Sequence, residues 1–145
     1  MTKETIALAS DHAGFSLKEI LKKELETLGY AVLDLGPFNE DSVDYPDFGY
    51  AMGDAIAAGK VARGVVICGS GIGISIAANR NPAVRAALVQ DGLAARLSRQ
   101  HNDSNVLALG ARLIGTETAK DCLKEFLNTP FDGDRHQRRV AMLSK

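Results

Sequence analysis

Short apolar runs alternate with stretches of helical periodicity along the chain, and this alternation restricts the fold more than any other feature. The apolar runs cover residues 5–10, 31–35, 65–68, 84–89 and 106–109. After the first run, Leu17, Leu21 and Leu25 recur at helical spacing, and Gly29 ends the pattern. Strand–helix alternation repeated five times predicts a parallel sheet with helices on both faces. We therefore expect an α/β fold, a Rossmann-like three-layer α/β/α sandwich around a five-stranded parallel sheet.

Further helices are expected over residues 46–59, 72–79 and 93–99, and from residues 116 and 134 onward. Residues 38–45 are expected to form an exposed loop. Open parallel sheets bind ligands outside the carboxyl ends of their strands. Of the side chains that can do chemistry, Asp11, His12, Tyr45 and Cys68 are expected there. His101 and Asn102 are expected after the fourth helix, in the loop that leads into the fifth strand.

Size and composition limit the class of protein. A chain of 145 residues, 46% of them hydrophobic, predicts one domain over residues 1–145 with a full core. The formal net charge of −1 gives no global field that favours nucleic acid or a membrane surface. The sequence shows no signal-peptide pattern and no membrane-length apolar run, so we expect a cytoplasmic protein. Its two cysteines do not form a disulfide framework.

The stretch VVICGSGIGIS, residues 65–75, places Cys68 at the end of a strand and three glycines before a helix. Backbone N–H groups in such a loop can cradle an anion. A dinucleotide loop would need a glycine at position 74 or 76, where the chain has isoleucine. The lysine of a Walker phosphate-binding loop is absent. A cysteine-phosphatase loop would need an arginine at position 74, where the chain has isoleucine. An anion cradle of another type is expected, with a plain tight turn as the alternative.

The two cysteines have different expected roles. A free cysteine is most often a small core residue, and Cys122 fits that description within an amphipathic helix. Cys68 faces a helix N-terminus, which favours the thiolate form of a cysteine. We therefore expect Cys68 to act as a nucleophile or a base.

Histidines and arginines offer further candidates. His12 adjoins Asp11, and His101 adjoins Asn102. For both histidines the alternatives are acid–base catalysis and a plain surface position. None of the three histidines has metal-ligand spacing, and no metal is expected. Arg135 and Arg139 are four residues apart in the tail, so the pair shares one helix face and suits a phosphate. The alternative for this tail is a solvated basic surface, and nucleic-acid binding is disfavoured.

Five segments together resemble a known family. They are SDHAG (10–14), DYPDF (44–48), ICGSGIGISIAANR (67–80), RQHNDSNVLALGAR (99–112) and DRHQRR (134–139). In this order they are similar to the type B ribose-5-phosphate isomerases, within the broader group that includes galactose-6-phosphate and allose-6-phosphate isomerases. The resemblance spans nearly the whole chain.

The resemblance implies an aldose–ketose isomerase that uses neither metal nor cofactor and passes through a cis-enediolate. Cys68 matches the general base, and His101 matches the group that opens the furanose ring. Ser70 matches a hydroxyl, often a threonine in the family, that moves protons between O1 and O2. The positions that match substrate contacts are Asp11, His12, Tyr45, Gly69, Gly71, Ile72, Gly73, Asn102, Arg112, Arg135 and Arg139. Some relatives carry a glutamate base later in the loop, where this chain has Ser75, so the cysteine mechanism is the better match.

The place of the phosphate is open from the residues alone. Phosphate groups often bind at helix N-termini, which would put the phosphate on residues 69–73. The resemblance instead puts the enediolate there and the phosphate on the arginines. The resemblance also implies a homodimer, or a dimer of such dimers, in which His101, Asn102 and the tail arginines face the partner's Cys68.

Three other functions remain as alternatives. The first is the same chemistry on a six-carbon sugar phosphate, such as allose 6-phosphate or galactose 6-phosphate. The second is a noncatalytic domain that binds a phosphorylated ligand. The third is a thiol hydrolase. Its phosphatase form is disfavoured because the chain has Ile74 where a cysteine phosphatase needs an arginine.

Overall fold

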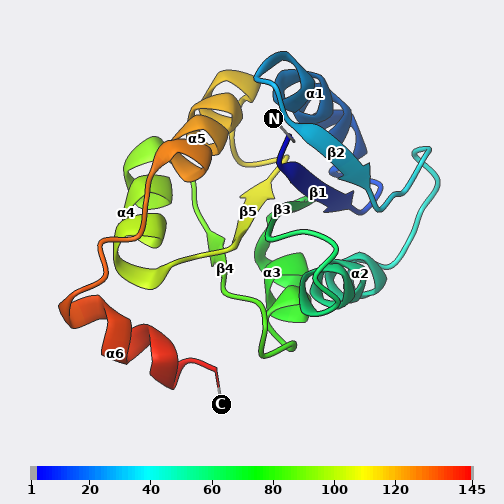
Figure 1. Ribbon diagram of the computed structural model, residues 1–145. Helices are drawn as coiled ribbons and strands as arrows, with labels where there is room; N and C mark the ends of the chain where they lie inside the picture. The colour runs from blue at the N-terminus through cyan, green and yellow to red at the C-terminus, as the bar shows by residue number, and fades with distance from the viewer. Residues whose placement is uncertain (1–2, 145) are drawn as a thin grey trace.

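The computed structural model describes residues 3–144 and contains a five-stranded parallel sheet in the order β2-β1-β3-β5-β4 (Figure 1). The strands are β1 (Thr5–Ser10), β2 (Ala31–Asp34), β3 (Arg63–Cys68), β4 (Ala86–Leu88) and β5 (Val106–Gly110). The register pairs Ser10 with Ile67, and Cys68 with Gly110. The ends of β1, β3 and β5 therefore lie level at the carboxyl edge of the sheet.

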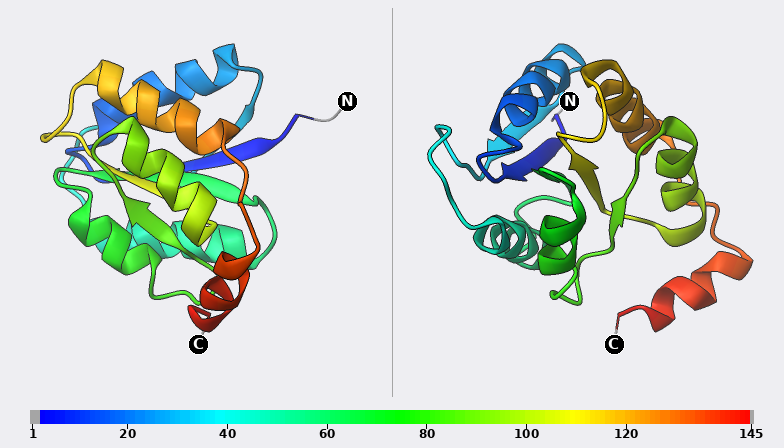
Figure 2. Two further views of the ribbon diagram at one scale, coloured as in Figure 1. Left: turned by 90° about the vertical axis from the view of Figure 1, so that its left-hand side faces the viewer. Right: turned by 180° about the vertical axis from the view of Figure 1, so that it is seen from behind.

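Six helices accompany the sheet in the described part of the chain. They are α1 (Phe15–Thr27), α2 (Tyr45–Ala57), α3 (Ile72–Ala78), α4 (Gly92–Asn102), α5 (Thr116–Asn128) and α6 (Arg135–Met142). Helices α1, α4 and α5 cover one face and α2 and α3 the other, whereas α6 stands apart from both layers (Figures 1 and 2). The expected three-layer α/β/α sandwich is confirmed.

Alternation along β3 decides which layer the thiol faces. Successive side chains of a strand point to opposite faces of the sheet. Val65 and Ile67 accordingly join the core beneath α1, α4 and α5, whereas Val66 and Cys68 join the core beneath α2 and α3. The Cys68 side chain is 4% exposed and lies on the side of the sheet from which α3 begins.

Close packing of α2 against α3 fixes the position of the loop before α3. A Cβ at Gly49 would lie 2.6 Å from the Cβ of Ala77 and 2.9 Å from the carbonyl oxygen of Ile74. Only glycine lets the two helices approach this closely. Helix α2 thereby holds α3, and with it the turn that follows Cys68.

Two expected boundaries are wrong. His101 and Asn102 belong to the last turn of α4 and not to a loop, because α4 continues to Asn102. Asp103 ends the helix in the left-handed conformation at φ 47°, and its carboxylate pairs with Arg99 at 2.9 Å. Tyr45 is the first residue of α2 and not part of the preceding loop.

A buried ion pair that the sequence analysis did not anticipate joins α1 to the end of β2. The Nζ of Lys18 donates to both carboxylate oxygens of Asp34, at 2.8 and 2.9 Å, and the Lys18 side chain is fully buried. Asp34 also accepts the N–H of Gly36 at 2.9 Å. This cluster fixes the start of the loop that leads to Tyr45. Among residues 3–144, no helix has both the length and the apolar character needed to cross a membrane.

Candidate active site

A cleft of about 570 Å³ opens at the carboxyl edge of the sheet. It lies where the strand order changes direction between β1 and β3, the usual ligand position in open α/β sheets. Asp11 reaches it from the end of β1, Cys68 from β3 and Arg112 from beyond β5. The lining residues are Asp11, Tyr45, Cys68, Gly69, Ser70, Ile72, Gly73, Ile76, Arg112 and Leu113.

The turn after β3 surrounds the thiol with backbone donors. The N–H of Gly71 donates to the Sγ of Cys68 at 3.1 Å, and the N–H of Ile72 donates to the Oγ of Ser70 at 3.1 Å. Within the described part of the chain, the N–H of Gly73 donates to no acceptor. The turn therefore places one backbone donor on the sulfur and leaves another for a developing negative charge in the cleft.

Gly71 is required by this geometry. Its φ of +78° lies in the left-handed region. A Cβ at this position would lie 2.8 Å from the carbonyl carbon of Leu109. A larger residue would push the turn away from β5 and move the donor away from Cys68.

Tyr45 and Arg112 close over two other glycines of the turn. The Tyr45 ring lies against Gly73, where an added Cβ would be 2.6 Å from its Cζ. The Arg112 guanidinium lies over Gly69, and the backbone N–H of Arg112 donates to the carbonyl of Gly69 at 2.9 Å. Both side chains are therefore held beside the thiol: Tyr45 was expected there from the strand ends, and Arg112 only from the resemblance.

Asp11 and His12 have structural partners in the SDHAG segment. The Oδ1 of Asp11 accepts the N–H of Gly14 at 3.0 Å, and Asp11 is 7% exposed. The Nδ1 of His12 accepts the N–H of Val43 at 3.1 Å, which assigns the ring proton to Nε2 in the neutral form. Asp11 lines the cleft, whereas His12 ties the loop before α2 to the end of β1.

Four expected site residues lie away from this cleft. Helix α4 runs back across the sheet, and its end packs beside the start of β4, where the Oγ of Ser104 donates to the carbonyl of Arg85 at 2.8 Å. His101 and Asn102 therefore lie at the amino edge of the sheet, not at the carboxyl edge where Cys68 is. Arg135 and Arg139 are exposed on α6. Among residues 3–144, none of these four lines the cleft around Cys68.

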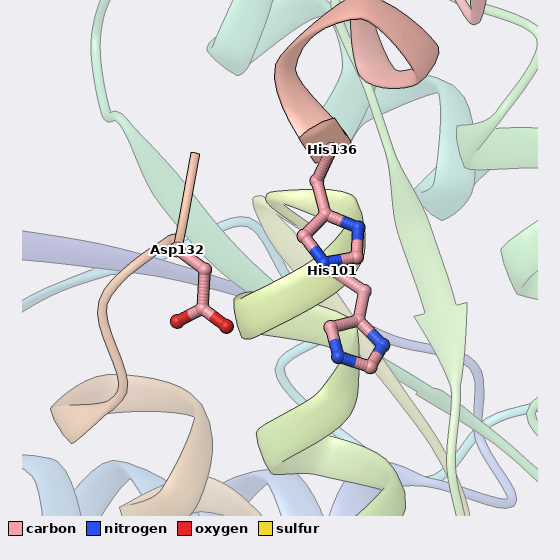
Figure 3. A group of neighbouring side chains, drawn as sticks. All are labelled: His101, Asp132 and His136. Atoms are coloured by element: carbon pink, nitrogen blue, oxygen red, sulfur yellow. The ribbon is translucent and has the colours of Figure 1, made fainter. Parts of the chain in front are cut away.

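His101 has close neighbours that the sequence analysis did not anticipate. Its ring stacks on His136 with centroids 4.5 Å apart and 15° between the planes, and Asp132 lies beside them (Figure 3). Burial lowers the pKa of His136, and the charges of Arg135 and His101 lower that pKa further. His136 lies inside the DRHQRR segment, but no spacing in the sequence pairs it with His101.

Two apolar cleft residues were also missed. Ile76 and Leu113 line the cleft and are 50% and 55% exposed. Ile76 is four residues beyond Ile72, which is 51% exposed, so the two share one face of α3. An isoleucine pair at helical spacing predicts core packing, and only the structure shows that this pair faces outward.

The fold and the site together define an α/β protein with a strand-end thiol in an amide cradle, suited to proton transfer on a small anionic substrate. The family model described as Ribose/Galactose Isomerase matches residues 6–143. The chain belongs to this ribose/galactose isomerase family.

Relatives and solved structures agree with this family. Ribose-5-phosphate isomerase B of Escherichia coli is 42% identical over 139 residues, which cover 96% of this chain and 93% of that protein. A ribose 5-phosphate isomerase structure from Thermotoga maritima superposes with a TM-score of 0.95 at 46% identity and covers 99% of each chain. The structure of ribose-5-phosphate isomerase B from Mycoplasma genitalium with bound ribulose-5-phosphate superposes with a TM-score of 0.93 at 38% identity. The match covers 99% of this chain and 96% of that one.

Proposed function

We propose that this chain catalyses the reversible isomerisation of D-ribose 5-phosphate and D-ribulose 5-phosphate through a cis-enediolate. The observation that carries the proposal is the N–H of Gly71 donating to the Cys68 Sγ, inside a cleft at the carboxyl edge of the sheet. Family membership, relatives named ribose-5-phosphate isomerase B, and a similar structure with bound ribulose-5-phosphate support it.

The chemistry follows from the groups around the cleft. The Cys68 thiolate takes the proton from C2 of the open-chain aldose, and negative charge builds on O1. Backbone N–H donors fixed in the turn stabilise that charge, and losing one such donor costs about 3 kcal/mol in comparable sites. The proton of O2 passes to O1, and Cys68 returns its proton to C1. The atoms of substrate and product thus balance without any other reactant.

Ser70 is suited to the transfer between the two oxygens. Its Oγ already accepts the N–H of Ile72, so the hydroxyl proton remains available to an oxygen in the cleft. Serine lacks the methyl group of the threonine that the family often carries here. Its χ1 is less restricted, and we expect the hydroxyl to be less tightly oriented before substrate binds.

The complete site is shared between two copies of the chain. Ring opening by His101, pocket contact by Asn102 and phosphate binding by Arg135 and Arg139 then come from a second copy. This arrangement is supported by the separation of these four residues from the Cys68 cleft and by the exposed apolar rim formed by Ile72, Ile76 and Leu113.

Replacement of Cys68 tests the proposal directly. Cys68→Ala should lower kcat by about 10²- to 10⁴-fold, the usual contribution of a positioned base, while calorimetry still detects ribose 5-phosphate binding. Cys122→Ala is the matched control, because Cys122 is fully buried away from the cleft and its pKa is raised to about 11, chiefly by burial. Near-normal turnover by Cys68→Ala would show that Cys68 is not the general base.

Two further assays separate the alternatives. Exchange of the C2 hydrogen with deuterated water, followed by NMR, distinguishes an isomerase from a domain that only binds the phosphate. Specificity constants for ribose 5-phosphate, allose 6-phosphate and galactose 6-phosphate distinguish five-carbon from six-carbon substrates. We propose a reaction that needs neither metal nor cofactor, so activity should persist in EDTA. The cytoplasmic location and the single domain stay predictions.

A further inference from the structure

Two imidazoles and a carboxylate gather at the junction of α4 and α6. One donor atom from each of His101, Asp132 and His136 lies within 4.8 Å of the other two (Figure 3). Each residue comes from a different segment: the last turn of α4, the loop after α5, and the first turn of α6. The cluster is therefore a product of tertiary structure, and no metal-ligand spacing in the sequence announces it.

Backbone contacts hold the three segments together. The N–H of Asp132 donates to the carbonyl of Gln100 at 3.1 Å, which ties the loop to the residue before His101. The N–H of His136 donates to the carbonyl of Gly133 at 2.9 Å, which fixes the first turn of α6 on that loop. The backbone of the three segments is thus held by hydrogen bonds that do not use the side-chain donor atoms.

The donor atoms are free to bind. Among the hydrogen bonds of residues 3–144, none involves the side chains of His101, Asp132 or His136. His101 is partly exposed and Asp132 is exposed, so an ion can enter from solvent. His136 is 8% exposed and forms the inner side of the cluster.

We propose that His101, Asp132 and His136 form a binding site for a nitrogen-preferring divalent metal ion, with Zn²⁺ as the type ion, and that occupancy inhibits the enzyme. Two histidines and a carboxylate, with a water as fourth ligand, are a standard donor set for Zn²⁺. Imidazole nitrogens disfavour Mg²⁺ and Ca²⁺, which take oxygen ligands. The inhibitory half rests on the proposed function of His101 in ring opening, because a nitrogen bound to metal cannot transfer a proton.

The geometry needs a small adjustment to hold the ion. Donors around a tetrahedral ion with bonds of about 2.1 Å are roughly 3.4 Å apart, and the three donor atoms here all lie within 4.8 Å of one another. A ligating imidazole also carries the metal in its ring plane, whereas the two rings here are stacked at 15°. One ring must turn about its Cβ–Cγ bond, a broad torsion with little preference. Arg135 and Arg139 on the same helix oppose a dication, and the Asp132 carboxylate offsets part of that charge.

Zinc binding is measured first, independently of catalysis. Isothermal titration with Zn²⁺ is run on Cys68→Ser protein, which removes the thiol at the cleft as a competing ligand. We expect one bound ion per chain, weakened at least about tenfold by adding Asp132→Asn or His136→Gln. Asp134→Asn is the matched control, since it removes the same charge from the same loop, two residues away, and should leave binding unchanged. Equal binding by all variants, or no binding by the parent protein, would overturn the site.

Inhibition is measured second, on protein that retains Cys68. Zn²⁺ should inhibit ribose 5-phosphate isomerisation, EDTA should restore it, and Asp132→Asn should require at least about tenfold more Zn²⁺ for the same inhibition. Inhibition unchanged by Asp132→Asn would place the inhibitory ion elsewhere, for example on Cys68. Zinc binding to the Cys68→Ser protein without any isomerase activity in the wild type would leave the metal site standing and contradict the proposed function.

Discussion

At the scale of single residues, the glycine turn determines what Cys68 can do. Without this turn the buried Cys68 would be only a core residue, as Cys122 is in α5. The left-handed Gly71 turns the chain back so that its N–H meets the Cys68 Sγ at 3.1 Å. The chemical role of the cysteine therefore depends on a residue that has no side chain.

Substitution of Gly71 tests this dependence, with Gly59 as a matched control. Both have positive φ, +78° and +74°, but a Cβ at Gly59 would have no atom within 4 Å. Gly59→Ala should lower the free energy of unfolding by about 1 to 2 kcal/mol through backbone strain alone. Gly71→Ala adds overlap with Leu109 and should cost roughly 2 to 5 kcal/mol. Urea denaturation measures both values.

Activity separates the two glycine variants further. Gly59→Ala should keep kcat when assayed well below its unfolding transition. Gly71→Ala should lose activity in proportion to the displaced donor, about 10²-fold or more. Equal kcat in the two folded variants would show that the Gly71 N–H has no part in catalysis.

Residue placement also shows what the sequence could predict of the site. Asp11, His12, Tyr45 and Cys68 were expected together because the carboxyl ends of parallel strands share one edge of the sheet, and all of them except His12 line the cleft. His101 was expected in the loop that leads into the fifth strand, yet it lies in the last turn of α4. The helix stops at Asp103 in a left-handed conformation that glycine usually supplies. No glycine marks the stop, so the end of the helix could not be recognised.

At the scale of secondary-structure elements, the join between α1 and β2 depends on charge as well as on apolar packing. Lys18 lies on a helix whose apolar positions were predicted, but its full burial was not. Its partner Asp34 is 16 residues later, on a strand beside β1. Pairing of two charges across elements has no local sequence signature, so it follows only from the tertiary structure.

Asp34 should make the stability depend on pH. Burial by itself raises the pKa of Asp34, but hydrogen bonds from Lys18 and Gly36 and the Lys18 charge outweigh it and hold the pKa below 3.8. A lowered pKa in the folded state gives stability that is present above pH 3.8 and is lost as pH falls through the folded value. Urea denaturation from pH 6 to pH 3 should show this loss in the wild type and a smaller loss in Asp34→Asn.

Near neutral pH the same substitution should destabilise the protein by roughly 3 kcal/mol, because Lys18 remains buried without its main counter-charge. Lys18→Met combined with Asp34→Asn should recover part of that loss by removing the buried charge. Asp41→Asn is the control, since Asp41 is exposed on the following loop. If Asp34→Asn is no less stable than Asp41→Asn, the buried pair is not what joins α1 to β2.

At the scale of the whole molecule, the chain separates the two halves of its proposed site. The sheet presents Cys68 at one edge, and α4 carries His101 to the other. Helix α6, with Arg135 and Arg139, stands outside both helix layers (Figure 2). The proposed two-fold dimer would have two equivalent sites, each taking one half from each copy.

Mixing two inactive variants tests the shared site. Cys68→Ala and His101→Ala are each expected to be inactive as homodimers, because every site lacks one group. In a dimer with one copy of each variant, one site carries both defects and the other carries neither. Random pairing makes about half of the dimers mixed, so co-expression should restore about a quarter of wild-type activity. Separate affinity tags on the two chains isolate the mixed dimer and raise the expected value to about half.

The control pairs two defects from the same half of the site. Cys68→Ala mixed with Gly71→Ala leaves one defect in each site of the mixed dimer, so no activity should return. Recovery with His101→Ala but not with Gly71→Ala requires His101 and Cys68 of one working site to come from different copies. Absence of recovery in a verified Cys68→Ala and His101→Ala mixed dimer would mean that each chain completes its own site. Helix α4 would then have to bring His101 to the carboxyl edge of its own sheet, against the direction in which it runs here.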